Sequence, residues 1–371
     1  MGCRGKLFLR RDPYNRKGAE ELFVRALREN AERCARGSEK YREMLERAGF
    51  EPKDLRSEED IALLPPIPTL YFKRNELFSV PERRLVVRAS SSGTKGQKSR
   101  VGLDASSLLY GLGMMYRFFR YHGVVSLRPT NYIVVGYEPS RHADTGAIKT
   151  AYGTTKFAPA LHREYALKDT GEGYAPNPEG VRRALFRYAK QPFPVRFVGF
   201  PAYLYLLVKT LEEEGVSLKL PRGSAVLLGG GWKEFSGREI GREEFLSLIE
   251  ARLGIPRERV LEFYSAVEHP HAYVKCECGN FHVPLYTRAF TRDCDTLEPL
   301  EEGEPGLLNF VTPLVSSMPL LSVLTDDIAV CGSGCACGNK APFFRLLGRA
   351  GAEGIKTCTA EAAELMRGAV K

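Results

Sequence analysis

Short apolar runs alternate with helical stretches through the middle of the chain, and this alternation constrains the fold more than any other feature of the sequence. Four runs are expected to be strands: 132–135, 196–198, 225–228 and 260–264. Apolar residues at helical spacing predict helices over 202–214 and 242–252. Strands that alternate with helices are typical of an α/β layered fold, in which helices cover a sheet.

The regions around this α/β middle have different patterns. Apolar residues at helical spacing over 17–49, followed by a Pro-rich extended link, predict a helical segment over 1–80 that packs on the core. The core is expected over 81–347. Its last part, 272–347, changes to strands and turns and contains most of the cysteines. Residues 348–371 are expected to form a hinge and a short tail.

A loop rich in serine and glycine follows a short strand at 85–87 and precedes a helix over 105–122, for which Asp104 is the expected N-cap. The loop contains the residue types that hold phosphate groups: Ser91, Ser92, Gly93, Thr94, Gly96 and Lys98. The glycines let backbone N–H groups converge, the hydroxyls add donors, and the lysine adds a positive charge. The spacing is not that of a Walker A loop, so an ordinary exposed loop is an equally open interpretation.

The formal net charge is +9, from 54 basic and 45 acidic side chains among 371 residues. The basic residues are spread along the chain, whereas nucleic-acid-binding proteins gather them on one element. The surplus suits small anionic substrates such as ATP or CoA. No stretch approaches the roughly 18 to 20 apolar residues that span a bilayer, and residues 1–6 lack the apolar segment of a signal peptide. We therefore expect a cytoplasmic protein without a membrane span.

The cysteines gather late in the chain. Two groups hold the candidate zinc ligands: Cys276, Cys278 and His282 in the first, and Cys331, Cys335 and Cys337 in the second. Two short ligand clusters on separated turns are what a tetrahedral zinc site requires, and a set of free buried cysteines is the competing interpretation. Cys294 fits neither group and is expected to be a buried thiol.

Four short segments resemble, in the same order, motifs of the acyl-adenylate-forming superfamily. The loop over 90–98 matches the superfamily's phosphate-loop signature, and 263–268 resembles its YGxTE motif. Segment 325–327 resembles the TGD motif, and 348–349 the GR pair at the hinge. Within the superfamily, the chain is most similar to the LuxE-type acyl-protein synthetases and their phenylacetate-CoA-ligase-like relatives. Further segments support this narrower likeness: 229–233, 268–270, 276–284, 324–327, 335–338 and 348–358.

The resemblance implies a fold, a nucleotide and roles for particular residues. The fold would be the layered αβαβα-like N-terminal lobe, with a strand-rich, zinc-bearing subdomain and a truncated C-terminal lobe. Tyr264 would stack on the adenine of ATP in a pocket lined by Gly230, Gly231 and Trp232. Without the resemblance, Tyr264 is better explained as a core aromatic.

Acidic and basic residues complete the implied nucleotide site. Glu268 would hold Mg²⁺, for which a hard oxygen ligand is suitable. Asp327 would accept hydrogen bonds from the ribose, supported by Arg349, although the residues alone favour a turn position for Asp327. Lys98 and Glu268 would act on the phosphates during the reaction.

The resemblance also implies a zinc set and an acyl-accepting thiol. The preferred zinc ligands are Cys276, His282, Cys335 and Cys337, with Cys278 or Cys331 as substitutes. In LuxE-type synthetases a cysteine at the position of Cys358 accepts the acyl group. Cys358 precedes a helical stretch and follows Lys356 by two residues, which favours the thiolate, but an incidental thiol fits the spacing equally well.

Two departures from the superfamily's pattern concern turnover. Val267 stands where the motif has a threonine, so the hydroxyl that would bond the α-phosphate is missing. Only 22 residues follow Arg349, and none of them matches the catalytic-lysine motif of the larger enzymes. Charge stabilisation would then come from the loop, Mg²⁺ and a partner chain.

The function we expect is ATP-dependent activation of a fatty or aryl acid to acyl-AMP, followed by transfer to a thiol. The thiol is Cys358 in an acyl-protein synthetase that hands the group to a reductase or carrier, and free CoA in an acyl-CoA ligase. Two different functions also stay open: a nucleotide-binding partner subunit without turnover, and a zinc-ribbon nucleic-acid binder. Residues 131–205 are expected to help build the acid pocket, with Phe200 and Tyr203 as candidates. The sequence leaves the acid and the oligomeric state open.

Overall fold

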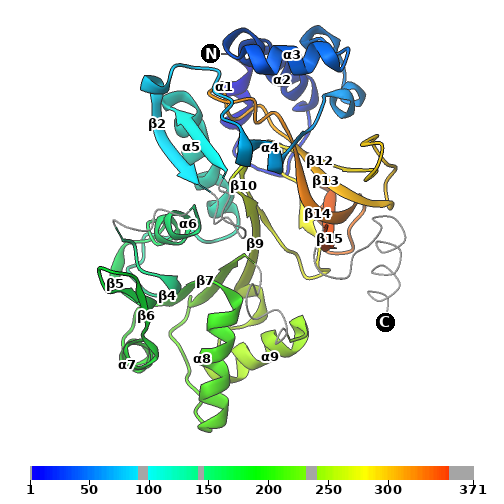
Figure 1. Cartoon of the computed structure of the whole chain (residues 1–371). Helices are drawn as coiled ribbons and strands as arrows, with labels where there is room; N and C mark the ends of the chain where they lie inside the picture. Colours follow the sequence, from blue (N-terminus) through cyan, green and yellow to red (C-terminus); the bar gives the residue numbers. More distant parts are fainter. Residues whose placement is uncertain (1, 91–98, 141–145, 231–239, 351–371) are drawn as a thin grey trace. The chain divides into compact units, whose positions relative to one another are not determined.

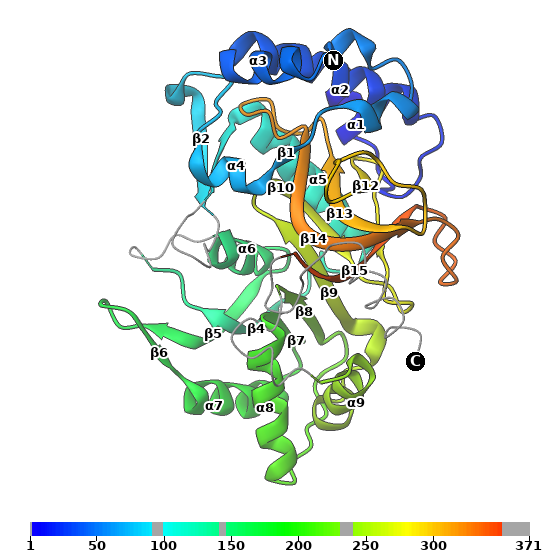
Figure 2. The same ribbon diagram turned by 45° about the vertical axis from the view of Figure 1, so that its right-hand side comes forward.

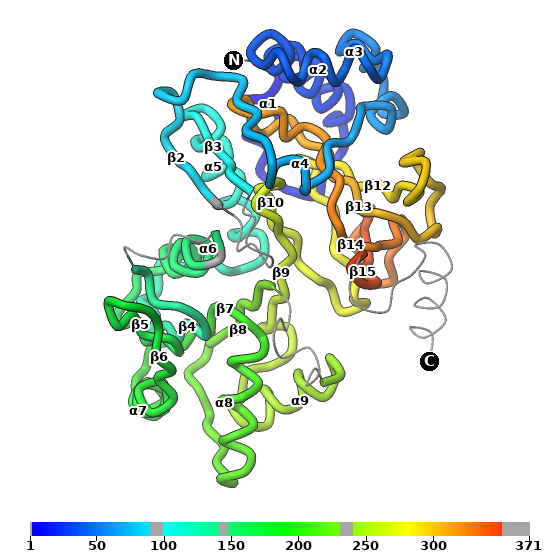
Figure 3. The backbone as a smooth tube through the Cα atoms, in the orientation of Figure 1, coloured from blue at the N-terminus to red at the C-terminus, as the bar shows by residue number. Residues whose placement is uncertain are grey.

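The chain forms two compact units. The computed structural model describes residues 2–90, 99–140, 146–230 and 240–350. The first unit combines Met1–Tyr121 with Ala266–Lys371, and the second is the continuous segment His122–Ser265. In Figure 3 the second unit is the green part of the trace, whereas the first is built from the two ends of the colour scale. The domain boundaries expected near residues 80 and 348 stay predictions.

The second unit is built on a mostly parallel sheet with the strand order β9-β8-β7-β4-β5-β6. Neighbouring strands run parallel, except that β6 is antiparallel to β5. The strands are β4 (Thr130–Tyr137), β5 (Ala160–Asp169), β6 (Tyr174–Pro176), β7 (Val195–Gly199), β8 (Ala225–Gly229) and β9 (Val260–Ala266). The four strands expected in this region are therefore confirmed.

Three helices cover one face of this sheet. The helices of the unit are α6 (Gly146–Thr154), α7 (Pro178–Ala189), α8 (Pro201–Glu213) and α9 (Arg242–Leu253), and a 3₁₀ turn, η5 (Arg257–Arg259), precedes β9. α7, α8 and α9 lie side by side in Figures 1 and 2. Their apolar residues share one core with Ile133, Val135 and Phe197 of the sheet. Because side chains alternate along a strand, Tyr132 and Arg196 face the opposite side. This layering confirms the expected α/β class.

The first unit contains an antiparallel sheet with the order β11-β15-β14-β13-β12, and β1 pairs in parallel with β14. The strands of this sheet are β1 (Ile67–Pro68), β11 (Phe281–His282), β12 (Arg288–Arg292), β13 (Pro305–Val311), β14 (Ser322–Gly332) and β15 (Phe343–Arg349). The unit also contains β10 (His269–Val274), which is not part of this sheet. A two-stranded hairpin consists of β2 (Leu85–Ser90) and β3 (Arg100–Asp104). The expected change to strands and turns after residue 272 is confirmed.

The N-terminal part of the first unit is helical, as expected. Its helices are α1 (Cys3–Phe8), α2 (Glu20–Gly37), α3 (Glu39–Arg47), α4 (Thr69–Arg74) and α5 (Ala105–Tyr121), with 3₁₀ turns η1 (Pro52–Asp54), η2 (Glu59–Leu63) and η3 (Glu82–Arg84). The segment expected to be helical over 17–49 breaks at Ser38, whose hydroxyl caps α3 by accepting the Tyr41 N–H. Asp104 caps α5 by accepting the Ser107 N–H at 2.9 Å, as expected. Within the described ranges, no helix is both long and apolar enough to cross a membrane.

Candidate functional site

Glycines stand where the parallel strands of the second unit end. β7 ends at Gly199, β8 ends at Gly229, and Gly230 follows directly. Gly199 has φ 139° and Gly230 has φ 81°, values that other residues rarely adopt. A Cβ on Gly199 would lie only 2.4 Å from the carbonyl oxygen of Val135, so this position requires glycine. Open α/β sheets bind their ligands outside this carboxyl edge.

Aromatic side chains gather at the same edge. Gly229 pairs in register with Phe263, which brings the following residues, Gly230 and Tyr264, to the same level of the sheet. Phe200 directly follows β7, and its ring lies so close to Gly230 that a Cβ there would approach it to 3.1 Å. The predicted adenine-pocket residues Gly230 and Tyr264 thus lie near the carboxyl ends of the neighbouring strands β8 and β9.

The Phe200 ring belongs to an aromatic cluster. Its centroid lies 6.3 Å from that of Tyr137 and 6.2 Å from that of Tyr203. Tyr137 in turn lies 4.9 Å from Tyr174, edge to face. Phe200 and Tyr203, the two candidates for the acid pocket, are therefore neighbours at the carboxyl edge. Tyr137 and Tyr174 were missed, although Tyr137 lies only two residues after the predicted strand 132–135.

Asp326 lies near the middle of β14 in the first unit and makes several polar contacts. Its carboxylate lies 3.5 Å from the Arg349 guanidinium and 3.8 Å from the Lys73 ammonium, and it accepts a hydrogen bond from Thr69 Oγ1 at 3.3 Å. Its carbonyl accepts the Ala350 N–H at 2.7 Å. Asp326 therefore connects α4, β14 and the end of β15.

Asp327, the predicted ribose ligand, is the register partner of Arg349 across β14 and β15. Successive residues of a strand point to opposite faces, so Asp327 points to the face opposite Asp326. Its N–H donates to Thr325 Oγ1 at 3.2 Å. The two predicted residues Asp327 and Arg349 are adjacent in the sheet, while the ion pair of Arg349 is with Asp326.

Glu268, the predicted magnesium ligand, lies in the turn between β9 and β10 and is only 5% exposed. The preceding residue, Val267, packs against the apolar core of the first unit. This contact gives a structural reason for valine where the superfamily motif has threonine.

Two histidines, His269 and His271, follow Glu268 in the buried strand β10. Their rings stack at 4.8 Å, and His269 also stacks on Phe310 at 4.6 Å. His269 Nε2 lies 2.7 Å from the Tyr273 hydroxyl, and His271 Nε2 lies 3.0 Å from Thr312 Oγ1. Burial lowers the pKa of His269 far below its usual value and lowers the pKa of His271 to about 3, so both rings are neutral.

The predicted zinc ligands come together in the first unit. One ligand atom from each of Cys276, His282, Cys335 and Cys337 lies within 4.8 Å of every other. The Cys276 and Cys335 sulfurs are 3.8 Å apart, and His282 Nε2 is 3.1 Å from the Cys337 sulfur. Neither proposed substitute, Cys278 or Cys331, belongs to this group among the residues that the structure describes. Cys294, expected to be buried, is partly exposed.

Two similar turns present these ligands. In the first, the Gly279 N–H donates to the Cys276 carbonyl at 3.0 Å, and Gly279 has φ 78°. In the second, the Gly338 N–H donates to the Cys335 carbonyl at 3.2 Å, and Gly338 has φ 82°. The glycines allow both turns to close tightly behind a cysteine.

Neighbouring polar groups orient the cluster. His282 Nδ1 lies 3.1 Å from the Ala341 carbonyl, which fixes the Nδ1–H tautomer and leaves Nε2 free to bind a metal. Burial raises the pKa of the Cys335 thiol, but hydrogen bonds from the Cys337 N–H and Asn280 outweigh it and bring the pKa to about 6. Thiolate character at Cys335 is what a metal ligand needs.

Comparison with known proteins identifies the family. The family model "Acyl-protein synthetase, LuxE" matches residues 7–366. The chain belongs to this family. The long-chain-fatty-acid–luciferin-component ligase of Aliivibrio fischeri is 25% identical over 72% of this chain and 69% of its own length. The ligase of the same name from Vibrio harveyi is 25% identical over 78% and 74%. The phenylacetate-coenzyme A ligase of Thermus thermophilus is 26% identical over 80% of this chain and 62% of its own.

Solved structures show the same fold. A 2-hydroxyisobutyryl-CoA ligase in the postadenylation state superposes with a TM-score of 0.68 at 17% identity, over 92% of this chain and 69% of that one. The sequence-based assignment to the LuxE-type, phenylacetate-CoA-ligase-like group is thus confirmed. As a family member with this fold, the chain is an ATP-dependent acid–thiol ligase of the adenylate-forming superfamily.

Some residues that the family assignment makes important lie outside the described ranges. They are Ser91, Ser92, Gly93, Thr94, Gly96 and Lys98 of the loop, Gly231 and Trp232 after β8, and the thiol Cys358. Asp326 and its partners Lys73 and Thr69 were missed by sequence reasoning. Their signal in the sequence is weak, because α4 has only six residues and directly follows a proline.

Proposed function

We propose that this chain activates a fatty or aryl carboxylic acid with ATP and transfers the acyl group to a thiol on the chain itself. The observation that carries the proposal is the match to the LuxE family over residues 7–366. The acid's carboxylate attacks the α-phosphate, which forms acyl-AMP and releases pyrophosphate. The acid class follows the names of the relatives, long-chain fatty acid in two and phenylacetate in another.

In the first step, Tyr264 stacks on the adenine at the carboxyl edge of the sheet. Gly230, Gly231 and Trp232 line the same adenine pocket. Asp327 accepts the ribose hydroxyls. The loop residues Ser91 to Gly96, with Lys98, bind the β- and γ-phosphates. Glu268 would hold Mg²⁺, which would offset the negative charge of the phosphates.

Asp326 positions the nucleotide residues without touching the nucleotide. Its pairs with Lys73 and Arg349 hold the end of β15 against β14, so Asp327 keeps its orientation. The aromatic cluster of Phe200, Tyr137 and Tyr203 is an apolar surface of suitable character for an acyl or aryl tail.

In the second step, the Cys358 sulfur attacks the carbonyl carbon of acyl-AMP. The carbon–sulfur bond forms, the bond from that carbon to the AMP oxygen breaks, and the thiol proton leaves to solvent. A reductase or carrier protein then takes the acyl group. The alternative acceptor is free CoA, which the coenzyme A ligases among the relatives favour.

Labelled acid distinguishes the two acceptors. The chain is incubated with ATP and radiolabelled tetradecanoic or phenylacetic acid, denatured and separated from small molecules. We expect label on wild-type chain and on the Cys294→Ser control, and none on Cys358→Ser, while all three retain ATP–pyrophosphate exchange. Label that appears only on added CoA, with none on wild-type chain, would refute the role of Cys358 and support the CoA ligase.

We further propose that the Cys276, His282, Cys335 and Cys337 cluster binds a structural zinc ion. Tetrahedral bonds of about 2.3 Å place two sulfur ligands roughly 3.8 Å apart. In the structure the Cys276 and Cys335 sulfurs are 3.8 Å apart. Metal analysis of purified protein should give one zinc per chain, retained in Cys331→Ser and lost in Cys335→Ser. Equal zinc content in the two variants would contradict the proposed set.

A further inference from the structure

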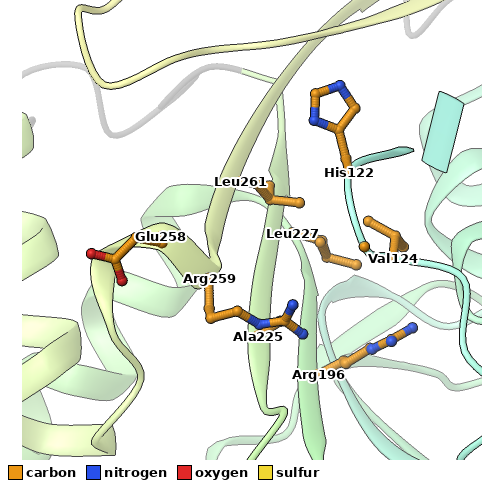
Figure 4. A pocket seen from close by; sticks show the side chains of 9 residues that line it. His122, Val124, Arg196, Ala225, Leu227, Glu258, Arg259 and Leu261 are labelled. Atoms are coloured by element: carbon orange, nitrogen blue, oxygen red, sulfur yellow. The ribbon is translucent and has the colours of Figure 1, made fainter. Parts of the chain in front are cut away.

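A small pocket lies at the amino edge of the second unit's sheet, away from the carboxyl edge where the nucleotide is proposed to bind (Figure 4). Arg196, the second residue of β7, and Ala225, the first residue of β8, form part of its floor. His122 and Val124, which precede β4, and Arg259 of η5 complete its wall. The nucleotide site does not account for any of these residues.

Arg196 is a buried cation with an unused donor. Its side chain lies on the sheet face opposite the helices, the residue is 3% exposed, and Nη1 has no hydrogen-bond partner. Within the described part of the chain, Arg196 forms no ion pair. Burying a charged group with an unpaired donor is costly unless a ligand or a counter-charge accepts a hydrogen bond from that donor and offsets the charge.

Arg259 brings a second positive charge to the same pocket. Its Nε and Nη2 donate to the carbonyls of Ser224 at 3.5 Å and Gly223 at 3.1 Å, which fixes the plane of the guanidinium. Burial, and then the positive charge of Arg196, lowers the pKa of Arg259, so the two cations are close enough to repel each other. The nearest acidic residue of the lining, Glu258, points away from both guanidinium groups in Figure 4.

The strand register shows why both arginines fit. Arg196 is the register partner of Ala225 on one side and of Tyr132 on the other. Because Ala225 has only a methyl group, the Arg259 side chain can reach across β8, as Figure 4 shows. Tyr132 is fully buried and closes the other side. The pocket is therefore lined by two arginines and the small residue Ala225.

We propose that this pocket binds a phosphate group, either as inorganic phosphate or as the terminal phosphate of a small molecule. Two guanidinium groups match the two negative charges of phosphate near neutral pH, and their planar N–H forks bind tetrahedral oxyanions in a bidentate manner. A carboxylate would neutralise only one of the two charges. A bound phosphate accepts a hydrogen bond from Arg196 Nη1, and its negative charge offsets the repulsion between the two arginines. The site is distinct from the proposed nucleotide site and does not depend on it.

Calorimetric titration of the full-length chain tests the proposal. The titrants are inorganic phosphate and glycerol 3-phosphate, with acetate and chloride at equal ionic strength as controls. Wild-type chain is compared with Arg259→Gln, Arg196→Met and the matched control Arg222→Gln, an exposed arginine of the same region. Lys98→Ala is included because the serine–glycine loop is itself a proposed phosphate site.

We expect phosphate to bind wild type, Arg222→Gln and Lys98→Ala alike, and to bind Arg259→Gln and Arg196→Met roughly tenfold or more weakly. Should Arg196→Met fail to fold, the result for partly exposed Arg259 decides alone. Tighter binding of glycerol 3-phosphate than of phosphate would assign a phosphate ester, and the reverse would assign the free ion. Four results would each overturn the proposal. Phosphate could bind all five proteins equally, or lose binding only in Lys98→Ala. Acetate could bind wild type as tightly as phosphate does, or phosphate could fail to bind at all.

Discussion

The ion pair between Glu58 and Arg288 offers a stringent test of what holds the first unit together. Arg288 lies on β12 with a side chain that is 5% exposed, and Glu58 precedes η2 with a side chain that is 29% exposed. The carboxylate pairs with two guanidinium nitrogens, and the Nε–Oε2 distance is 2.6 Å. The guanidinium also lies 3.8 Å above the centre of the Phe23 ring. The pair therefore fastens the N-terminal helical segment to the antiparallel sheet.

Replacing Glu58 by glutamine keeps the shape and removes the counter-charge. Breaking a fully buried pair costs about 3–5 kcal/mol, because one charge is left uncompensated. Two features reduce this cost: Glu58 is partly exposed, and Arg288 keeps its hydrogen bonds to the Leu285 and Thr287 carbonyls and its contact with Phe23. We therefore expect Glu58→Gln to lower the free energy of unfolding by about 2–3 kcal/mol.

The assay is thermal and urea unfolding of the wild type and the variant. For a unit of this size, a loss of 2–3 kcal/mol corresponds to a melting temperature lower by about 4–12 °C. The matched control is Glu82→Gln, whose partner Arg88 lies 2.6 Å away but whose side chain is 59% exposed, so its loss should stay below about 1 kcal/mol. If the two variants lose the same stability, the argument from burial is wrong.

Three further perturbations have expected results. Asp326→Asn should raise the KM for ATP roughly tenfold in pyrophosphate exchange while changing stability by less than about 1 kcal/mol, since its ion pairs are partly exposed. Gly199→Ala should lower the free energy of unfolding by about 2–4 kcal/mol, whereas Gly173→Ala, with no atom within 4 Å of the added Cβ, should be nearly neutral in the same urea titration. Because the pKa of His271 is about 3 when folded and near 6.5 when unfolded, its stabilisation is present above pH 6.5 and is lost as the pH falls toward 3. At pH 5 the wild type has lost about 2 kcal/mol of its free energy of unfolding through this histidine. Between pH 7 and pH 5, the urea midpoint of His271→Gln should therefore fall less than that of the wild type.

Much of the fold could be predicted because the central strands are buried on both faces. β4, β7 and β8 consist largely of apolar residues. These apolar runs identify the three segments as strands without reference to the rest of the chain. β5 was missed for the opposite reason. It carries His162, Arg163 and Glu164 in succession and pairs on its outer side only with the three residues of β6, so its pattern is polar.

The cysteine cluster and the acidic pair Asp326–Asp327 of β14 differ in the same way. The cysteine cluster could be anticipated because thiols and glycines recur at fixed short spacing, which is a local property of the sequence. The role of Asp326 could not, because Asp326 and Asp327 are adjacent and chemically identical. Which of them meets Arg349 depends on the register and on the irregularity between Ile328 and Ala329, which only the paired strands reveal.

One hairpin joins these two features. β14 contains Asp326 and Asp327 near its middle and ends at Gly332, just before the turn that presents Cys335 and Cys337, and β15 returns from that turn to end at Arg349. A slip of one residue between the strands would turn every side chain of one strand to the other face. A turn fixed at one end of the hairpin therefore fixes which carboxylate meets Arg349 at the other. The proposed zinc ligands and the proposed ribose ligand thus depend on the same register, although they take no part in the same chemistry.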